Sequence, residues 1–187
     1  MFAYLLGSIP FGVVLARFKR VDLRQHGSGN IGATNAARTL GKTAGILTLA
    51  GDCGKGYLAV WIAGQLLEAQ WAVAVAGLMV FLGHVFSIFL KFKGGKGVAT
   101  GLGVFLYLMP WAGLSSMGIF AVSLVFTRYV SVSSLLAAIT IPWFGIYFQA
   151  PGPFVYVATA AAIITVIRHR ENIQRLIDGT ESKFMKK

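Results

Sequence analysis

Acidic residues and cysteine are scarce in this sequence. Only 6 of its 187 residues are Asp or Glu, against 17 Lys or Arg, and Cys53 is the single cysteine. One cysteine excludes an intrachain disulfide and a cysteine-based zinc site. Charged residues make up 12% of the chain and hydrophobic residues 56%, and the mean hydropathy is +0.71. This balance is too apolar for a water-soluble domain of this length and indicates a membrane protein.

Long apolar segments recur along the chain. The windows 111–128 and 130–149 contain almost no charge, as expected for helices in the hydrocarbon core. Segment 1–16 lacks the basic start and the cleavage site of a signal peptide, so we interpret it as the first span. Because no repeat or linker is visible, we predict one membrane domain over 1–187. It is expected to be an all-α integral membrane protein with about seven transmembrane helices, near residues 1–16, 55–67, 70–90, 97–109, 111–127, 130–148 and 153–167.

Two parts of this arrangement are ambiguous. Segment 97–109 is shorter than the roughly 20 residues that a helix needs to cross the hydrocarbon, which leaves a five-span arrangement open. The stretch 43–67 contains Asp52 and Lys55. It is either one long span with an intramembrane ion pair, or an interfacial segment followed by a break at 51–56 and a span. We favour the second interpretation.

Basic residues occupy every second connection between the predicted spans. The intervening connections contain no Lys or Arg. The basic residues are Arg17, Lys19, Arg20, Arg24, Arg38, Lys42, Lys91, Lys93, Lys96, Arg128, Arg168, Arg170, Arg175, Lys183, Lys186 and Lys187. Because cytoplasmic loops carry the excess of Lys and Arg, we expect the N-terminus outside and the C-terminus in the cytoplasm. The cytoplasmic location of these residues therefore explains the net positive charge of the chain, and the sequence predicts no nucleic-acid partner.

The first of three polar segments on the predicted cytoplasmic side is HGSGNIGATNAAR, from His26 to Arg38. Its glycines let backbone N–H groups turn toward one point, and its Ala-rich end can begin a helix whose N-terminus favours an anion. This pattern predicts a phosphate-binding loop. The G-x-G-x-x-G spacing over 27–32 is typical of dinucleotide sites, but it follows a membrane helix and not a buried strand, so we interpret that match as accidental.

The second polar segment is GHVFSIFLKFKGGKGVATG, over 83–101. Lys96 is flanked by three glycines, and such a turn can direct backbone donors and a compact positive charge toward a phosphate. These glycines are Gly94, Gly95 and Gly97. The spacing does not match the P-loop of ATPases. Lys91 and Lys93 are explained by snorkelling at a helix end. His84 could also serve the site, but we favour packing at a helix end as its explanation.

The third polar segment, RHRENIQR over 168–175, follows the last predicted span. If that span continues as a helix, His169 and Asn172 share a face at i, i+3. Histidine is the side chain that titrates near neutral pH, so His169 is a candidate general base.

Together, GSGNIGATNAAR, GHVFSIFLKFKGGKGVATG and HRENIQRLIDGTES resemble the acyl-phosphate:glycerol-3-phosphate acyltransferases of bacteria, the PlsY family. The resemblance covers nearly the whole chain. It implies transfer of an acyl chain from acyl phosphate to the 1-position of glycerol 3-phosphate, giving lysophosphatidate and inorganic phosphate. It also implies a bacterial inner-membrane location, a site at the cytoplasmic face, no metal or cofactor, and no direct use of acyl-CoA or acyl carrier protein. The chain has no H-x₄-D pair, the dyad of the better-known glycerolipid acyltransferases.

The resemblance and the residue pattern predict the site. The catalytic residues would be Ser28, Lys96 and His169. The substrate-binding residues would be Gly27, Gly29, Asn30, Thr34, Asn35, Arg38, Gly94, Gly95, Gly97 and Asn172. Either His169 or the acceptor phosphate, whose second pKa is near 6, could take the hydroxyl proton. Ser87 stands where many members of the family have proline, and we expect it to alter a helix kink and not the chemistry.

A transporter of phosphate esters is the alternative from another functional class. Its half-helices would also direct N-termini and lysines at an anion, but near the middle of the bilayer. Here the polar segments gather at one predicted face, and the opposite connections are short and uncharged. The sequence therefore favours an enzyme with its polar site at the membrane surface, next to the bilayer that would take up the acyl chain.

Overall fold

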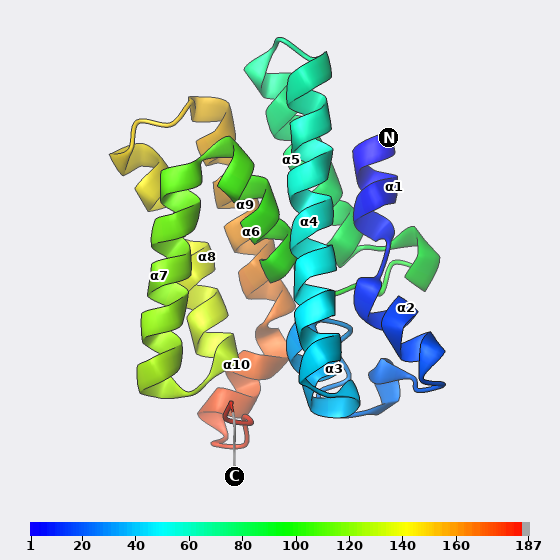
Figure 1. The fold of residues 1–187 in the computed structure, drawn as a ribbon. Coiled ribbons are helices and arrows are strands. Elements are labelled where there is room, and N and C mark those ends of the chain that lie inside the picture. The colour runs from blue at the N-terminus through cyan, green and yellow to red at the C-terminus, as the bar shows by residue number, and fades with distance from the viewer. Residues whose placement is uncertain (185–187) are drawn as a thin grey trace. The chain divides into compact units, whose positions relative to one another are not determined.

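The computed structural model describes residues 1–184, which form helices and connecting loops without any strand (Figure 1). In chain order the helices are α1 (Phe2–Ser8), α2 (Phe11–Phe18), α3 (Ala33–Leu40), α4 (Lys42–Leu66), α5 (Gln70–Val85), α6 (Val98–Leu108), α7 (Pro110–Thr127), α8 (Val130–Tyr147), α9 (Gly152–Arg168) and α10 (Arg170–Ile177). Two short 3₁₀ turns are η1 (Leu23–Gln25) and η2 (Ile88–Leu90). Lys186 and Lys187, two of the predicted cytoplasmic cations, lie outside the described residues.

The chain divides into two compact units, Met1–Val104 and Phe105–Lys187. In the first unit, α1 packs on α5 and α4, and α2 and α3 pack on α4. In the second, α7 packs on α8, α8 on α9 and α9 on α10. The boundary falls inside α6. The sequence predicts a single membrane domain over 1–187. Whether the two units act as one domain stays a prediction.

The first predicted span, 1–16, is a pair of short helices. α1 ends at Ser8 and α2 begins at Phe11, with Ile9 in an extended conformation (φ −63°, ψ 115°). Pro10 explains this break, because proline lacks an N–H and disfavours a helical conformation at the residue before it.

The segment 43–67 lies within one continuous helix, α4, which has 25 residues. The favoured interpretation, with a break at 51–56, was therefore wrong. Asp52 and Lys55 do not interrupt the helix, because they pair with each other at 2.7 Å inside the first unit. Glycine does not interrupt it either. Gly56 lies where an added Cβ would meet the Thr100 backbone, so it permits a close approach of α6.

The second unit follows the predicted helices closely. α7, α8 and α9 begin and end within about one residue of the expected 111–127, 130–148 and 153–167. Pro110 starts α7, a position where its missing N–H is of no consequence. The chain bends by 53° between α9 and α10. The last span therefore does not continue as a straight helix, which was the condition for placing His169 and Asn172 on a shared face.

By length and composition, three helices of residues 1–184 could cross a membrane: Gln70–Leu90, Pro110–Thr127 and Val130–Tyr147. A fourth is possible if the bent pair Gly152–Arg168 and Arg170–Ile177 is one span. Large apolar side chains are exposed on these helices, such as Phe126 at 83% and Tyr147 at 76%. Such extensive apolar exposure is expected of surfaces that face lipid. The predicted number of seven spans stays a prediction.

Candidate active site

Asn35 holds the first glycine-rich loop in place. The side chain is 1% exposed, and its Oδ1 accepts a hydrogen bond from the backbone N–H of Ser28 at 2.9 Å. The two hydrogens of its Nδ2 are shared among three carbonyls, those of Leu23 at 3.0 Å, His26 at 3.0 Å and Asn30 at 2.8 Å. A single buried amide therefore satisfies four backbone groups of the loop. Whether Asn35 also contacts substrate stays a prediction.

Ser28 lies exposed at the tip of this loop, between two glycines with left-handed backbone conformations. Gly27 has φ +61° and Gly29 φ +70°, values that side chains other than glycine rarely adopt. An added Cβ at Gly27 would also meet Oδ1 of Asn35. The sequence Gly-Ser-Gly is thus required by the turn, and the turn presents the Ser28 hydroxyl to the surface.

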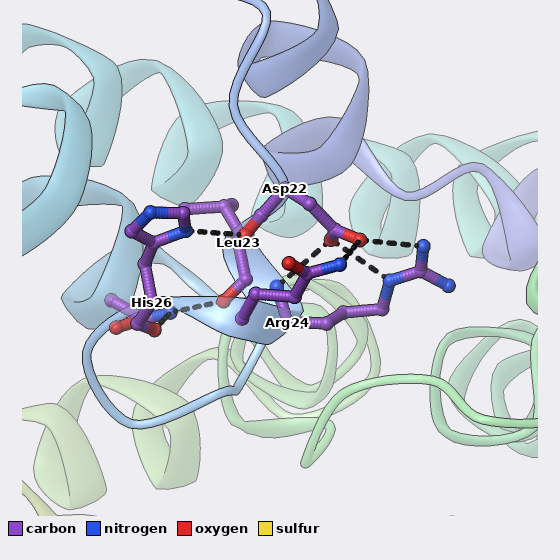
Figure 2. A network of polar contacts seen from close by, with 6 residues as sticks. Asp22, Leu23, Arg24 and His26 are labelled. Atoms are coloured by element: carbon purple, nitrogen blue, oxygen red, sulfur yellow. Dashed lines mark hydrogen bonds and ion pairs between the residues drawn. The ribbon is translucent and has the colours of Figure 1, made fainter.

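An ion pair beside the loop was not singled out by the sequence (Figure 2). The Asp22 carboxylate accepts hydrogen bonds from Nε of Arg24 at 3.0 Å and from Nη2 at 2.9 Å. These side-chain bonds lower the pKa of Asp22 to about 2. Nδ1 of His26 lies 2.9 Å from the Asp22 carbonyl, which can only accept. This exposed network orders the start of the loop and neutralises Arg24 locally, and exposed ion pairs add little to stability.

The second glycine-rich loop folds back onto the end of α5. The N–H of Gly94 donates to the carbonyl of Val85 at 3.1 Å, and the N–H of Gly95 to the carbonyl of His84 at 3.0 Å. These carbonyls belong to the last turn of α5, where helical partners are missing. The loop therefore has a defined position relative to the helix before it.

Lys96 differs from the other lysines of this connection. It is half-buried, whereas Lys91 and Lys93 are exposed. Gly97, next to it, has φ +87°, and an added Cβ there would meet the ring of Phe81. The glycines that flank Lys96 thus allow the backbone to lie directly against α5, and Lys96 projects from this fixed turn. Whether Lys96 contacts a substrate stays a prediction.

Thr100, in the first turn of α6, is a polar residue that sequence reasoning missed. The side chain is fully buried, and Oγ1 has no hydrogen-bond partner among the described residues. A buried hydroxyl without a partner is unfavourable and needs an explanation. Thr100 lies four residues after Lys96 and near the N-terminus of a helix, and this position in the sequence could have marked it as a candidate site residue.

One helix, α4, supports both loops of the first unit. Gly45 packs against Ala37 of α3, the helix that follows the first loop. Nearly three turns further on, Lys55 contacts His84, on which the second loop rests, at 3.0 Å. With a rise of about 1.5 Å per residue, these two contacts are roughly 15 Å apart along the helix axis.

His169 and Asn172 lie in the second unit, at the bend between α9 and α10. His169 is 3% exposed, and its Nδ1 lies 2.8 Å from the carbonyl of Thr165. Because a carbonyl only accepts, Nδ1 carries the proton, and the lone pair of the neutral ring is on Nε2. A proton acceptor in this ring would therefore be Nε2.

Asn172 belongs to a second small network. Its Nδ2 donates to Oε1 of Glu181 at 2.7 Å, and Nε of Arg175 donates to Oε2 at 2.8 Å. Burial raises the pKa of Glu181, but the hydrogen bonds from Arg175 and Asn172 outweigh it, so this pKa lies below its usual value. These bonds to Glu181 hold the chain that follows α10 against that helix.

The other predicted residues show a mixture of exposure. Thr34 is half-buried in the first turn of α3, and Arg38 is exposed in its last turn. Two recesses lie nearby, of about 280 and 390 Å³. Both are lined by Val13, Arg17, Phe89 and Leu90, and by none of the predicted site residues. Within residues 1–184 no group of three or more His, Cys, Asp or Glu side chains is arranged to hold a metal.

A family model described as glycerol-3-phosphate acyltransferase matches residues 1–179. The chain belongs to this family. The glycerol-3-phosphate acyltransferase of Trichlorobacter lovleyi is 52% identical over 183 residues, which cover 97% of this chain and 94% of the relative. That of Desulfotalea psychrophila is 46% identical over 191 residues, with coverage of 100% and 97%.

Two crystal structures of PlsY, an integral membrane glycerol 3-phosphate acyltransferase, have a closely similar fold. The glycerol 3-phosphate form has a TM-score of 0.95 at 43% identity, over 98% of this chain and 92% of that one. The lysophosphatidic acid form has a TM-score of 0.92 at 42% identity, with the same coverage. The PlsY resemblance seen in the three sequence motifs is thus confirmed, and this acyltransferase is an all-helical integral membrane protein.

The bonds of Asn35 predict a specific defect when its side chain is removed. Asn35→Ala leaves several buried loop groups without partners, at about 1–3 kcal/mol for each unsatisfied group. The midpoint of thermal unfolding in detergent should fall, and trypsin should cleave faster after Arg24. Gln25→Ala, an exposed change in η1 directly before the loop, serves as the control. Unchanged cleavage and stability in Asn35→Ala would show that the loop does not depend on this amide.

Proposed function

We propose that this acyltransferase uses acyl phosphate as its donor and acylates the 1-hydroxyl of glycerol 3-phosphate. The products would be 1-acyl-glycerol 3-phosphate and inorganic phosphate. The observation that carries the proposal is the pair of glycine-rich turns, each built around one exposed or half-buried polar side chain, Ser28 and Lys96. A donor and an acceptor that both contain phosphate require two such cradles, whereas acyl-CoA and acyl carrier protein would require contacts to a far larger carrier.

The phosphate groups would be bound by backbone N–H groups and by cations. Charge-assisted hydrogen bonds from Lys and Arg to phosphate are about twice as strong as neutral ones. Lys96 and Arg38 are the cations that we assign to the substrates, with Gly27, Gly29, Asn30, Thr34, Gly94, Gly95, Gly97 and Asn172 as further binding residues. We assign Asn35 chiefly to holding the loop, because its amide already bonds to four backbone groups.

The reaction needs no covalent enzyme intermediate, because an acyl phosphate is already activated. The oxygen of the acceptor's 1-hydroxyl attacks the acyl carbonyl carbon, and the bond from that carbon to the bridging oxygen breaks. Phosphate leaves with the electron pair. The hydroxyl proton passes to Nε2 of His169 or to the acceptor phosphate. The bond from Nδ1 of His169 to Thr165 supports the first route, since it directs the lone pair to Nε2. Ser28 would donate its hydroxyl hydrogen to a phosphate or to the developing oxyanion.

We place the site at the cytoplasmic face of the bacterial inner membrane. About seven spans with the N-terminus outside would put both glycine-rich loops and the α9–α10 bend on this side, by the distribution of Lys and Arg. The acyl tail would remain in the bilayer while its phosphate reaches the loops. The one-sided polar segments also favour this arrangement over a transporter, whose polar site would lie at the midplane.

A direct comparison of donors tests the proposal. Purified protein should form lysophosphatidate from glycerol 3-phosphate with acyl phosphate, and should form none with acyl-CoA or acyl carrier protein of the same chain length. Product phosphate should appear in equal amount to lysophosphatidate. Efficient turnover of acyl-CoA in preparations for which acyl phosphate is inert would refute the assignment of the donor.

The second test separates a binding cation from an anchoring one. If Lys96 contacts a substrate phosphate, Lys96→Ala should lose roughly 2–5 kcal/mol of transition-state stabilisation. This corresponds to a decrease in kcat/KM of about 30-fold to 5,000-fold. Lys93→Ala is the matched control because Lys93 is exposed in the same connection, and it should stay within about threefold of the wild type. Near-normal kcat/KM in Lys96→Ala for both substrates, or equal loss in the two variants, would contradict the proposed cradle.

A further inference from the structure

Three ionisable side chains from α4 and α5 meet in the interior of the first unit. Asp52, Lys55 and His84 are 2%, 3% and 4% exposed. Nζ of Lys55 lies 2.7 Å from Oδ1 of Asp52 and 3.0 Å from Nδ1 of His84. Ionisable groups buried in a membrane protein are unfavourable and usually functional. The proposed mechanism uses none of these three.

The geometry of Lys55 determines which ring nitrogen of His84 carries the proton. The ammonium group has three N–H bonds, and it has three acceptors within reach: Oδ1 of Asp52, Nδ1 of His84 and the carbonyl of Ile9 at 2.6 Å. If Nδ1 carried the proton, its N–H would point at the Lys55 ammonium 3.0 Å away, which is also a donor. Its remaining acceptor would be Oδ1 of Asp52, at a long distance of 3.5 Å. Nδ1 is therefore the acceptor, and the neutral ring carries its hydrogen on Nε2.

The protonated nitrogen faces the lysine loop. Nε2 of His84 is the heavy atom nearest to the position of a Cβ on Gly95, closer than any ring carbon. The carbonyl of the same histidine accepts the N–H of Gly95 at 3.0 Å. His84 therefore holds Gly95 through its backbone carbonyl, and its Nε2 edge fills the space beside Gly95 that a side chain would otherwise occupy.

We propose that Asp52 and Lys55 fix the tautomer of His84, and that the Nε2–H of His84 positions the loop Gly94–Gly97 for phosphate binding. His84 is then a positioning residue, which acts through the loop. The inference rests on the proposed function, since it assigns that loop to phosphate. It also explains why the chain keeps a buried ion pair beneath the loop, where an apolar contact would be simpler.

Two substitutions distinguish the two nitrogens of His84. The amide nitrogen of glutamine reaches about as far as Nε2, so His84→Gln keeps a donor toward Gly95. The shorter His84→Asn can satisfy Lys55 but has no donor at the loop. We expect kcat/KM for acyl phosphate to fall at least about tenfold in His84→Asn and to stay within about threefold of the wild type in His84→Gln. The loss in His84→Asn should appear mainly in KM, because it reflects a displaced phosphate cradle.

A readout that does not depend on activity accompanies the kinetics. Limited trypsin digestion followed by mass analysis reports cleavage after Lys93 and Lys96, which should accelerate in His84→Asn and not in His84→Gln. Equal impairment of the two variants, equal tolerance, or greater damage in His84→Gln would overturn the proposal. If the wild type is inactive with acyl phosphate, the proposed function fails, but the cleavage pattern still decides whether the Nε2–H orders the loop.

Discussion

The structure depends on how Lys55 and its neighbours satisfy the backbone at two helix breaks. A carbonyl freed by a helix break and buried from water needs a partner from the protein. The contacts join Lys55 Nζ to the Ile9 carbonyl at 2.6 Å, Ser87 Oγ to the Ser8 carbonyl at 2.6 Å and Tyr4 Oη to the Phe86 carbonyl at 2.7 Å. They fasten the break between α1 and α2 to the end of α5. The positive charge of Lys55, which bonds to the Ile9 carbonyl, is neutralised by the Asp52 carboxylate.

This arrangement links the apolar interior to the polar loops. The α5 helix stops at Val85, and its last carbonyls receive the N–H groups of the second glycine-rich loop. A membrane helix that continued straight would leave no acceptors for that loop. Ser87 was expected only to alter a helix kink. Its buried hydroxyl also donates a hydrogen bond to the Ser8 carbonyl, at the break between α1 and α2. A proline at this position would remove that donor.

Much of the fold could be predicted from the apolar pattern, because helices such as α7 and α8 are uniform hydrophobic segments bounded by polar residues or proline. The path of α4 could not, because the sequence allowed both a long span with an Asp52–Lys55 ion pair and a break at 51–56, and the contacts that bury this pair come from other parts of the chain. For the site, residue types predicted two glycine-rich turns, which the structure contains, and the roles of their residues toward substrate stay predictions. The partners of Asn35 and the contact between Lys55 and His84, 29 residues apart, follow from tertiary packing that one sequence does not encode locally.

The buried ion pair is tested most directly by thermal unfolding of four proteins in one detergent: the wild type, Lys55→Met, Asp52→Asn and the double variant. Lys55→Met leaves the Ile9 carbonyl without its partner and the buried Asp52 carboxylate with only the long contact to His84 at 3.5 Å, so it should lose about 3–5 kcal/mol. The double variant removes both charges and should be more stable than Lys55→Met alone, though less stable than the wild type, so the two effects should not add. Additive losses, or a Lys55→Met protein as stable as the wild type, would contradict the claim that this pair holds the broken helices together.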